Sequence, residues 1–311
     1  MSGSTLVNAI ERCREAAIHV AWSQWSMLGG QVGGRVTTPS AIVDPEALVL
    51  FSCALRDDEP RLWDLVGGFL AEGSSLLSVQ RTRNLAAAFP VRVRETMREV
   101  AAIAVADGKD ARWRPLATGK PRPYRPGKVY KPAGHIAAPS ALVLRLRLAL
   151  GVHARTDALA YLLAIAPAGA TAREVADATG YGPIPVRRAL DAMATSRLVL
   201  AEGTRPERYH VSLDQWGPLL GGGAPLPRWR HWHQLFAFLA EVLPSRTAKR
   251  VSERSAYLES SDLRRVVLAH RQALTRNRIL VPEPSDYPGE AFLDGFERTL
   301  TAVATWLGAN V

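Results

Sequence analysis

The sequence predicts a mostly α-helical protein with one small β-hairpin, and three observations carry this prediction. Along most of the 311 residues, apolar side chains recur at intervals of three and four, which is the period of an amphipathic helix. Two short strand-like runs, 197–202 and 207–212, are separated by a turn that contains Gly203 and Pro206, a pattern typical of a hairpin. A basic, Pro-rich stretch over 109–139 interrupts the helical pattern and divides the chain.

The composition restricts the class of protein. A chain of this length with 47% hydrophobic residues can bury a core and is expected to form two or three domains. No apolar run approaches the roughly 20 residues that cross a membrane, and the first residues lack the order of a secretory signal, so we expect a cytoplasmic protein without membrane contact. Cys13 and Cys53 lie in apolar helical contexts and are expected to be reduced packing residues.

The positive charge is concentrated in the stretch 109–139. The net charge is +10, and between positions 109 and 131 eight basic residues stand against one acid, which leaves +7 in that segment. Its prolines exclude an ordinary helix or a central strand. The segment is either an arm that follows a nucleic-acid backbone or a solvated linker. In the first case its phosphate contacts come from Arg122, Arg125 and Lys128.

Residues 1–108 predict an N-terminal helical domain. Helical periodicity covers the stretches 5–25, 44–56, 59–73, 75–89 and 94–108. Asp44 is expected to cap the second of these helices, with Pro45 at its first position. The Gly-rich run 28–35 matches neither a Walker loop nor a dinucleotide fingerprint, so we expect a flexible connection there.

Residues 140–216 predict a second helical domain that ends in the hairpin. The stretch 140–151 alternates leucine with arginine, which also fits a strand, but its leucine and alanine content favours a helix. A further helix is expected over 154–165. The next begins with a capping box formed by Thr171 and Glu174 and ends at a turn that Gly180 permits. The helix after that turn has an inward stripe of Val186, Leu190 and Met193.

Two prolines stand where this last helix begins. With Gly182 as N-cap, Pro183 is the first helical residue and Pro185 the third, where a backbone amide has no intrahelical partner to lose. A residue before proline resists the α conformation, which applies to Ile184. We therefore expect a regular helix only from about Pro185 onward.

The order of helix, capping box, turn, helix and hairpin over about 154–213 resembles the winged helix-turn-helix domain of bacterial transcriptional regulators such as the MarR and GntR groups. The likeness is carried by "TAREVADATGYG", "VRRALDAM" and "LVLAEGTRPERYHVS" and covers under a quarter of the chain. It implies a fold that is mostly α, in which a winged helix-turn-helix with a small β-hairpin wing is flanked by N- and C-terminal helical domains.

The resemblance also implies where DNA is bound. In the related regulators the first turn of the reading helix presents polar groups to base edges, whereas here Ile184 between two prolines offers only contact with a thymine methyl. Arg188 is the candidate for a base contact and Arg187 for phosphate. The candidate DNA-binding residues of this domain are Thr171, Arg173, Tyr181, Ile184, Arg187, Arg188, Arg205 and Arg208.

Residues 217–311 predict a C-terminal helical domain, with helices over 228–243, 261–279 and 288–307. Helices that flank a DNA-binding domain often hold two copies together, because two protein half-sites then match two DNA half-sites. We expect a homodimer. His231, His233 and His270 have no nearby partners at metal-ligand spacing, so we expect no metal site. No catalytic motif occurs, so we expect no cofactor and no enzymatic activity.

Two functions of different classes remain open. The first is a DNA-binding transcriptional regulator, of the repressor kind, that grips double-stranded DNA through the domain at 140–216. The alternative is a protein-interaction module, for instance the antitoxin partner in a two-gene toxin–antitoxin system, with DNA binding autoregulatory or lost. Salt-dependent binding to duplex DNA distinguishes the two.

Overall fold

A computed structural model describes residues 2–30, 40–120, 122–125, 136–220, 226–243 and 255–310 of the chain, and for residues 2–4 the backbone only. Within these ranges the protein is mostly helical, and its one named sheet is a two-stranded antiparallel hairpin. The mostly-α fold class is therefore confirmed. Among the described residues, no helix is both long and apolar enough to cross a membrane. Most of the Gly-rich run 28–35 lies outside the described residues.

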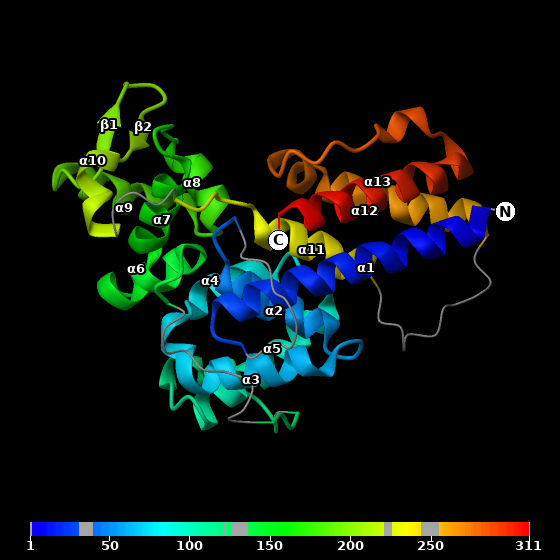
Figure 1. Cartoon of the computed structure of the whole chain (residues 1–311), viewed down its shortest axis with the longest axis horizontal. Coiled ribbons are helices and arrows are strands. Elements are labelled where there is room, and N and C mark those ends of the chain that lie inside the picture. Colours follow the sequence, from blue (N-terminus) through cyan, green and yellow to red (C-terminus); the bar gives the residue numbers. More distant parts are fainter. Residues whose placement is uncertain are drawn as a thin grey trace.

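Eight helices of the described chain form what we call the flanking unit. They are α1 (Ser2–Met27), α2 (Pro45–Leu55), α3 (Pro60–Gly73), α4 (Val79–Ala86), α5 (Val91–Ala106), α11 (Trp232–Val242), α12 (Ala256–Arg276) and α13 (Phe292–Ala309). One hydrophobic core joins them, with α1 lying along α13 and α11 against α2 (Figure 1). The rings of Phe51 and Phe236 stack there with centroids 4.4 Å apart. The ranges 1–108 and 217–311 thus share a core, because α11 is apolar on nearly all sides and needs neighbours from both.

The remaining elements form a smaller central unit with a core of its own. They are α6 (Leu142–Leu150), α7 (Ala154–Ile165), α8 (Ala172–Thr179), α9 (Pro183–Thr195), β1 (Leu200–Glu202), β2 (Arg208–His210) and α10 (Leu213–Trp216). The expected stripe of Val186, Leu190 and Met193 is buried against α7 and α8. Strands β1 and β2 pair in antiparallel register, and Ala170 adds a bridge to Tyr209 on the free side of β2.

Local sequence accounts for most helix ends. Asp44 accepts a hydrogen bond from the Ala47 amide at 3.1 Å, and Pro45 takes the first position of α2, as expected. The stretch 140–151 contains the helix α6, as favoured, preceded by a short 3₁₀ turn. The predicted helix over 75–89 is wrong at its start, because Ser78 caps a new helix by accepting from the Arg81 amide. Short 3₁₀ turns also occur over 74–76, 111–113, 218–220, 284–286 and 289–291.

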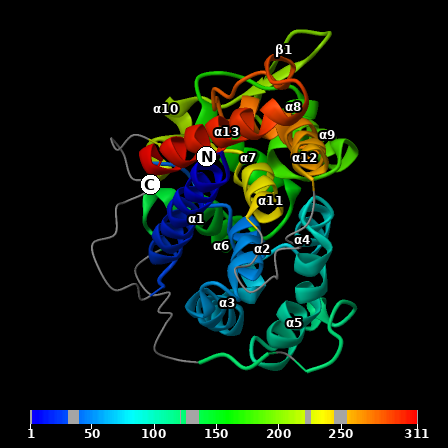
Figure 2. The same cartoon turned by 90° about the vertical axis from the view of Figure 1, so that its right-hand side faces the viewer.

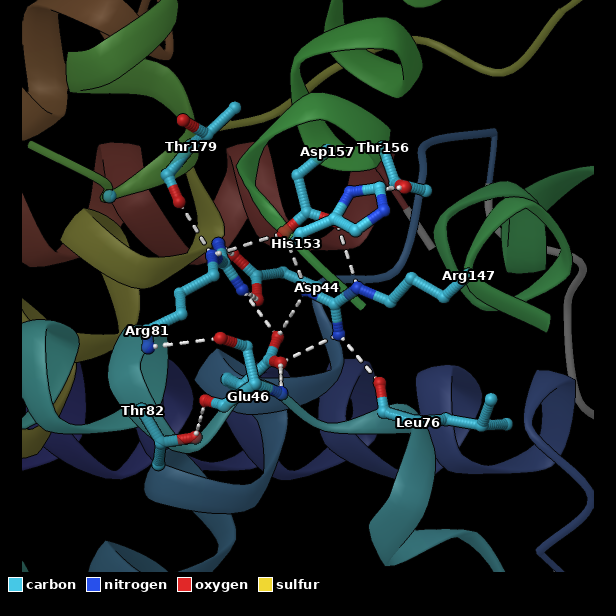
Figure 3. A network of polar contacts seen from close by, with 12 residues as sticks. Asp44, Glu46, Leu76, Arg81, Thr82, Arg147, His153, Thr156, Asp157 and Thr179 are labelled. Carbon is cyan, nitrogen blue, oxygen red and sulfur yellow. Dashed lines mark hydrogen bonds and ion pairs between the residues drawn. The ribbon is translucent and has the colours of Figure 1, made fainter. Parts of the chain in front are cut away.

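A fully buried set of five charged residues joins the two units, and we call it the ion cluster (Figure 3). Its members are Asp44 and Glu46 of α2 and its N-cap, Arg81 of α4, Arg147 of α6 and Asp157 of α7. Arg81 reaches Asp44 at 2.6 Å and Glu46 at 2.5 Å. Arg147 reaches Glu46 and Asp157, both at 2.6 Å. Glu46 therefore lies between the two guanidinium groups.

The ion cluster is held in its charged state by this geometry. Burial by itself would raise the pKa of Asp44, but the charge and hydrogen bonds of Arg81 outweigh it and lower that pKa to about 2. Burial likewise opposes the charge of Arg147, while Asp157 and Glu46 raise its pKa well above the ordinary value. Because each charge depends on its partners for solvation, removal of one member leaves its partners buried with part of their compensating charge lost.

The central unit is also attached to α4 through its own backbone. The Arg81 Nε donates to the Thr179 carbonyl at 2.5 Å, and Asn84 Nδ2 donates to the Gly180 carbonyl at 3.2 Å. Gly180 has a φ of 73°, and a β-carbon there would lie 2.4 Å from the Leu85 side chain. Gly180 is thus required both by the turn and by the close approach of α4.

We expect Arg81→Ala to lower the free energy of unfolding by about 3–5 kcal/mol, because Asp44 and Glu46 would stay buried without one of their cations. Arg83→Ala is the matched control, since Arg83 lies on the same helix and is exposed. That variant should stay within about 0.5 kcal/mol of the parent. Urea unfolding followed by circular dichroism measures both. Equal midpoints for the two variants would contradict a structural role of the ion cluster.

Candidate nucleic-acid interface

Helix α8 is fixed at both of its ends. Thr171 Oγ1 accepts from the Glu174 amide at 3.2 Å, and Glu174 Oε2 accepts from the Thr171 amide at 2.7 Å, which completes the predicted capping box. Gly180 ends α8 in the left-handed conformation. The turn that leads to α9 therefore begins at a defined end of α8.

Helix α9 accommodates its two prolines from its first turn. Gly182 is extended and stands before Pro183, which is the first helical residue, as expected. The Val186 amide donates to the Gly182 carbonyl at 3.3 Å, so the first intrahelical bond closes despite Pro185. The helix is assigned from Pro183, two residues before the regular start that we expected at Pro185.

The outward face of α9 presents two guanidinium groups. Arg187 and Arg188 are both exposed, on the side of the helix away from its buried stripe. The Arg187 Nη1 lies 3.7 Å from Glu207 Oε2, with 56% of the Arg187 side chain still exposed. Arg188 has no hydrogen-bond or ion-pair partner in the described part of the chain, and it borders a shallow groove between the starts of α7 and α9. Ile184 is 67% exposed at the start of the helix.

The two arginines of the hairpin differ in their surroundings. Arg205 lies in the exposed turn between β1 and β2, and no partner for its side chain occurs within the described ranges. Arg208 donates to the Gly169 carbonyl and lies 3.4 Å from Glu174 Oε2, with 48% of its side chain exposed. Arg205 is therefore available to a phosphate, whereas Arg208 already neutralises a carboxylate at the root of the hairpin.

The candidates on α8 and its turn have different accessibilities. Arg173 is exposed, and Thr171 is partly buried with its hydroxyl engaged in the capping box. The Tyr181 hydroxyl is buried and has no hydrogen-bond partner in the part of the chain that the structure describes. Burial raises the pKa of Tyr181, and the nearby charge of Asp157 in the ion cluster raises it further. The expectation that Tyr181 contacts DNA is corrected on this ground, because its polar atom points into the protein.

The described part of the basic arm lies on the flanking unit, at the end of the molecule away from β1 and β2 (Figures 1 and 2). Arg122 forms a 2.8 Å ion pair with Asp57, and its amide donates to Glu99. The Arg125 amide donates to Asp64 at 2.8 Å. Acidic residues of α3, α5 and the segment before α3 thus hold this part of the arm on the flanking unit, and the expectation that Arg122 and Arg125 bind DNA stays a prediction. Lys128 lies outside the described residues.

The histidines that we considered as metal ligands differ in their surroundings. Burial lowers the pKa of His233 to about 3 and that of His231 to about 4, and Asp44 near His233 offsets only part of this effect. His270 instead contacts Glu241, at 2.8 Å. No group of three metal-ligating side chains occurs among the residues that the structure describes.

Sequence reasoning missed two groupings of charge. One is the ion cluster, of which only the capping role of Asp44 was visible. The other is a cleft between the central and flanking units. Its arginines come from β2, from the segment before α11, and from α12 and the segment after it. Neither has a local signal, because each depends on contacts between distant parts of the chain, such as Glu46 with Arg147 and Asp177 with Arg276.

Comparisons with known proteins identify no relative of this chain. The chain matches no model of a known protein family, no curated protein and no solved structure.

The buried histidines predict a loss of stability in mild acid. A histidine with an unfolded pKa of 6.5 that falls to about 3 in the folded state binds its proton only on unfolding between those values. The free energy of unfolding should therefore fall as the pH drops from about 6.5 to about 4. We expect His233→Gln to reduce that slope by about 1.4 kcal/mol per pH unit.

Urea titrations at a series of pH values measure this slope. His19→Gln is the control, since His19 is exposed on α1 and its loss should leave the slope unchanged. A His233→Gln slope equal to that of the parent protein would show that His233 is not buried in its neutral form.

Proposed function

We propose that the protein is a DNA-binding transcriptional regulator, of the repressor kind, and that α7, α8, α9 and the β1–β2 hairpin act as a winged helix-turn-helix. The observation that carries this proposal is the division of α9 into two faces. Val186, Leu190 and Met193 are buried, while Arg187 and Arg188 are exposed on the other side. A helix held by its apolar face with exposed guanidinium groups outward suits insertion into a major groove.

The contacts of such a complex follow from the exposure of each side chain. Arg188, without an acidic partner, is assigned to a base edge, and Arg187 and Arg205 to the phosphates on either side. Ile184 is assigned to a thymine methyl. Arg173 and Thr171 at the start of α8 lie where the phosphate backbone passes in domains of this kind. Because one guanidinium supplies most of the polar base contact, DNA shape is expected to contribute to sequence preference.

We further propose that the regulator is a cytoplasmic homodimer. Helix α12 exposes Tyr257, Leu258 and Leu268, each by at least 50%. Two copies joined through this surface would place two α9 helices on one duplex, with half-sites about one helical turn apart. A light-scattering mass of one chain, with and without DNA, would contradict this part of the proposal.

One observation favours the second candidate function, a protein-interaction module. Ile184 is 67% exposed between two prolines, at the position where a reading helix normally offers polar groups. An apolar edge of this kind suits a protein partner, such as the toxin of a two-gene system. In that case α9 would serve for docking, and its arginines would contribute little to DNA affinity.

We expect the parent protein to bind a duplex of about 20 base pairs with an affinity that falls steeply with salt. The double variant Arg187→Ala/Arg188→Ala should bind at least tenfold more weakly, and the slope of log affinity against log salt should become shallower by about 1–2. Fluorescence anisotropy at two or more salt concentrations measures both quantities.

The matched control is Arg94→Ala/Arg98→Ala, which removes two exposed arginines from α5 of the flanking unit. Because it makes the same change in net charge, it separates the face of α9 from a general effect of charge. Equal losses of affinity in the two double variants would count against DNA recognition by α9. No measurable binding by the parent at low salt would leave the docking module as the better account.

A further inference from the structure

A cleft with a volume of about 570 Å³ lies between the central unit and the flanking unit. Its walls come from α7, the residues between α7 and α8, the hairpin root, the segment before α11 and the end of α12. The volume is within the range of pockets that hold small organic ligands. The cleft is separate from the outward face of α9, since neither Arg187 nor Arg188 lines it.

The charge of the cleft is strongly unbalanced. Five arginines line it, namely Arg208, Arg228, Arg230, Arg276 and Arg278. Two of these arginines form ion pairs with carboxylates: Glu174 lies 3.4 Å from Arg208, and Asp177 lies 2.8 Å from Arg276. Five cations against two anions leave three positive charges around one cavity.

The other three arginines have no carboxylate partner within the described residues. The side chains of Arg228 and Arg278 have no hydrogen-bond or ion-pair partner among the described residues, and both are exposed. Arg230 lies over the Trp306 ring, 5.4 Å from its centroid. Burial lowers the pKa of Arg230, and the positive charges of Arg228 and Arg278 lower it further. The repulsion among these groups is a cost that an anion between them would remove.

Buried polar atoms without partners adjoin the same cavity. Trp229 Nε1, Arg230 Nε and His231 Nδ1 are all buried, and none has a hydrogen-bond partner among the described residues. Buried polar atoms in native proteins nearly always have a partner, so three exceptions on consecutive residues of one cleft point to a missing one. Trp229 also forms an edge-to-face pair with Tyr161, with centroids 5.2 Å apart, which gives the cleft an aromatic wall.

We propose that this cleft is a binding site for a small, multiply charged organic anion, held by Arg228, Arg230 and Arg278. Guanidinium groups pair with phosphate and carboxylate oxygens through two parallel hydrogen bonds, and both kinds of anion share this chemistry. The aromatic wall favours a ligand that carries a ring next to its charged groups, as nucleotides do. The site stands independently of the proposed DNA binding, because it is defined and measured without DNA.

Isothermal titration calorimetry on the full chain tests the site with a series of probes. Pyrophosphate, tripolyphosphate and ATP test phosphate, citrate tests carboxylate, and adenosine tests the ring without charge. We expect one binding event per chain for at least one class of anion and none for adenosine. ATP should bind more tightly than tripolyphosphate if Tyr161 and Trp229 contact the ring. Whichever anion class binds more tightly identifies the source of the charge.

The variant Arg228→Gln/Arg278→Gln should weaken anion binding by roughly tenfold or more. Both residues are exposed, so the fold should be kept, which circular dichroism checks. The control Arg94→Gln/Arg265→Gln removes two exposed arginines outside the cleft and should bind as the parent does. The proposal is overturned by equal weakening in both variants or by no binding of any anion at about 1 mM. It is also overturned if only duplex DNA binds and loses affinity in the cleft variant, since the cleft would then hold a phosphate backbone.

Discussion

The pairing of two buried arginines with three buried carboxylates is the interaction on which the arrangement of this protein depends. Glu46 accepts from both Arg81 and Arg147, so the flanking unit and the central unit each supply one cation to the same carboxylate. Charges removed from water are tolerated only when partners and hydrogen bonds replace that water. The Leu76 carbonyl and the Ser78 amide complete this replacement, at 2.9 Å from Arg147 and 2.7 Å from Glu46. Apolar packing alone is not directional, whereas this set of contacts admits one relative position of the two units.

That constraint determines what the protein offers to a partner. Because Arg81 also donates to the Thr179 carbonyl, the turn before α9 is attached to the flanking unit, and α9 must present its opposite face to solvent. The described part of the basic arm, by contrast, is engaged in contacts within the chain. The Arg122 guanidinium pairs with Asp57 and the Arg125 amide donates to Asp64, so acids of the flanking unit hold this part of the arm in place. Exposed arginines of the described chain that lie near a possible ligand are found on α9, on the hairpin and in the cleft.

The sequence predicts the parts of this fold that depend on neighbours within one or two helical turns. The capping box at Thr171, the N-cap at Asp44 and the inward stripe of α9 each rely on residues three or four positions apart, and each is confirmed. Long-range pairing is what local patterns cannot reveal. Arg145 and Arg147 stand in the same alternating run, yet Arg147 is buried because Glu46, about 100 positions away, lies opposite it. Tyr181 was misassigned for the same reason, since the ion cluster that its hydroxyl approaches comes from several distant helices.

The two proposed sites meet at the root of the hairpin, which gives them a physical means of influencing each other. Arg208 belongs to β2, lines the cleft and contacts Glu174, and Glu174 in turn accepts from the Thr171 amide at the start of α8. An anion in the cleft would compete with Glu174 for Arg208. Any such exchange alters the charge at the start of α8 and the support of the hairpin, both of which the DNA proposal uses. Coupling of two ligands requires a group whose preferred partner differs between the two states, and Arg208, which contacts Glu174 and lines the cleft, is the residue at which such a difference would arise.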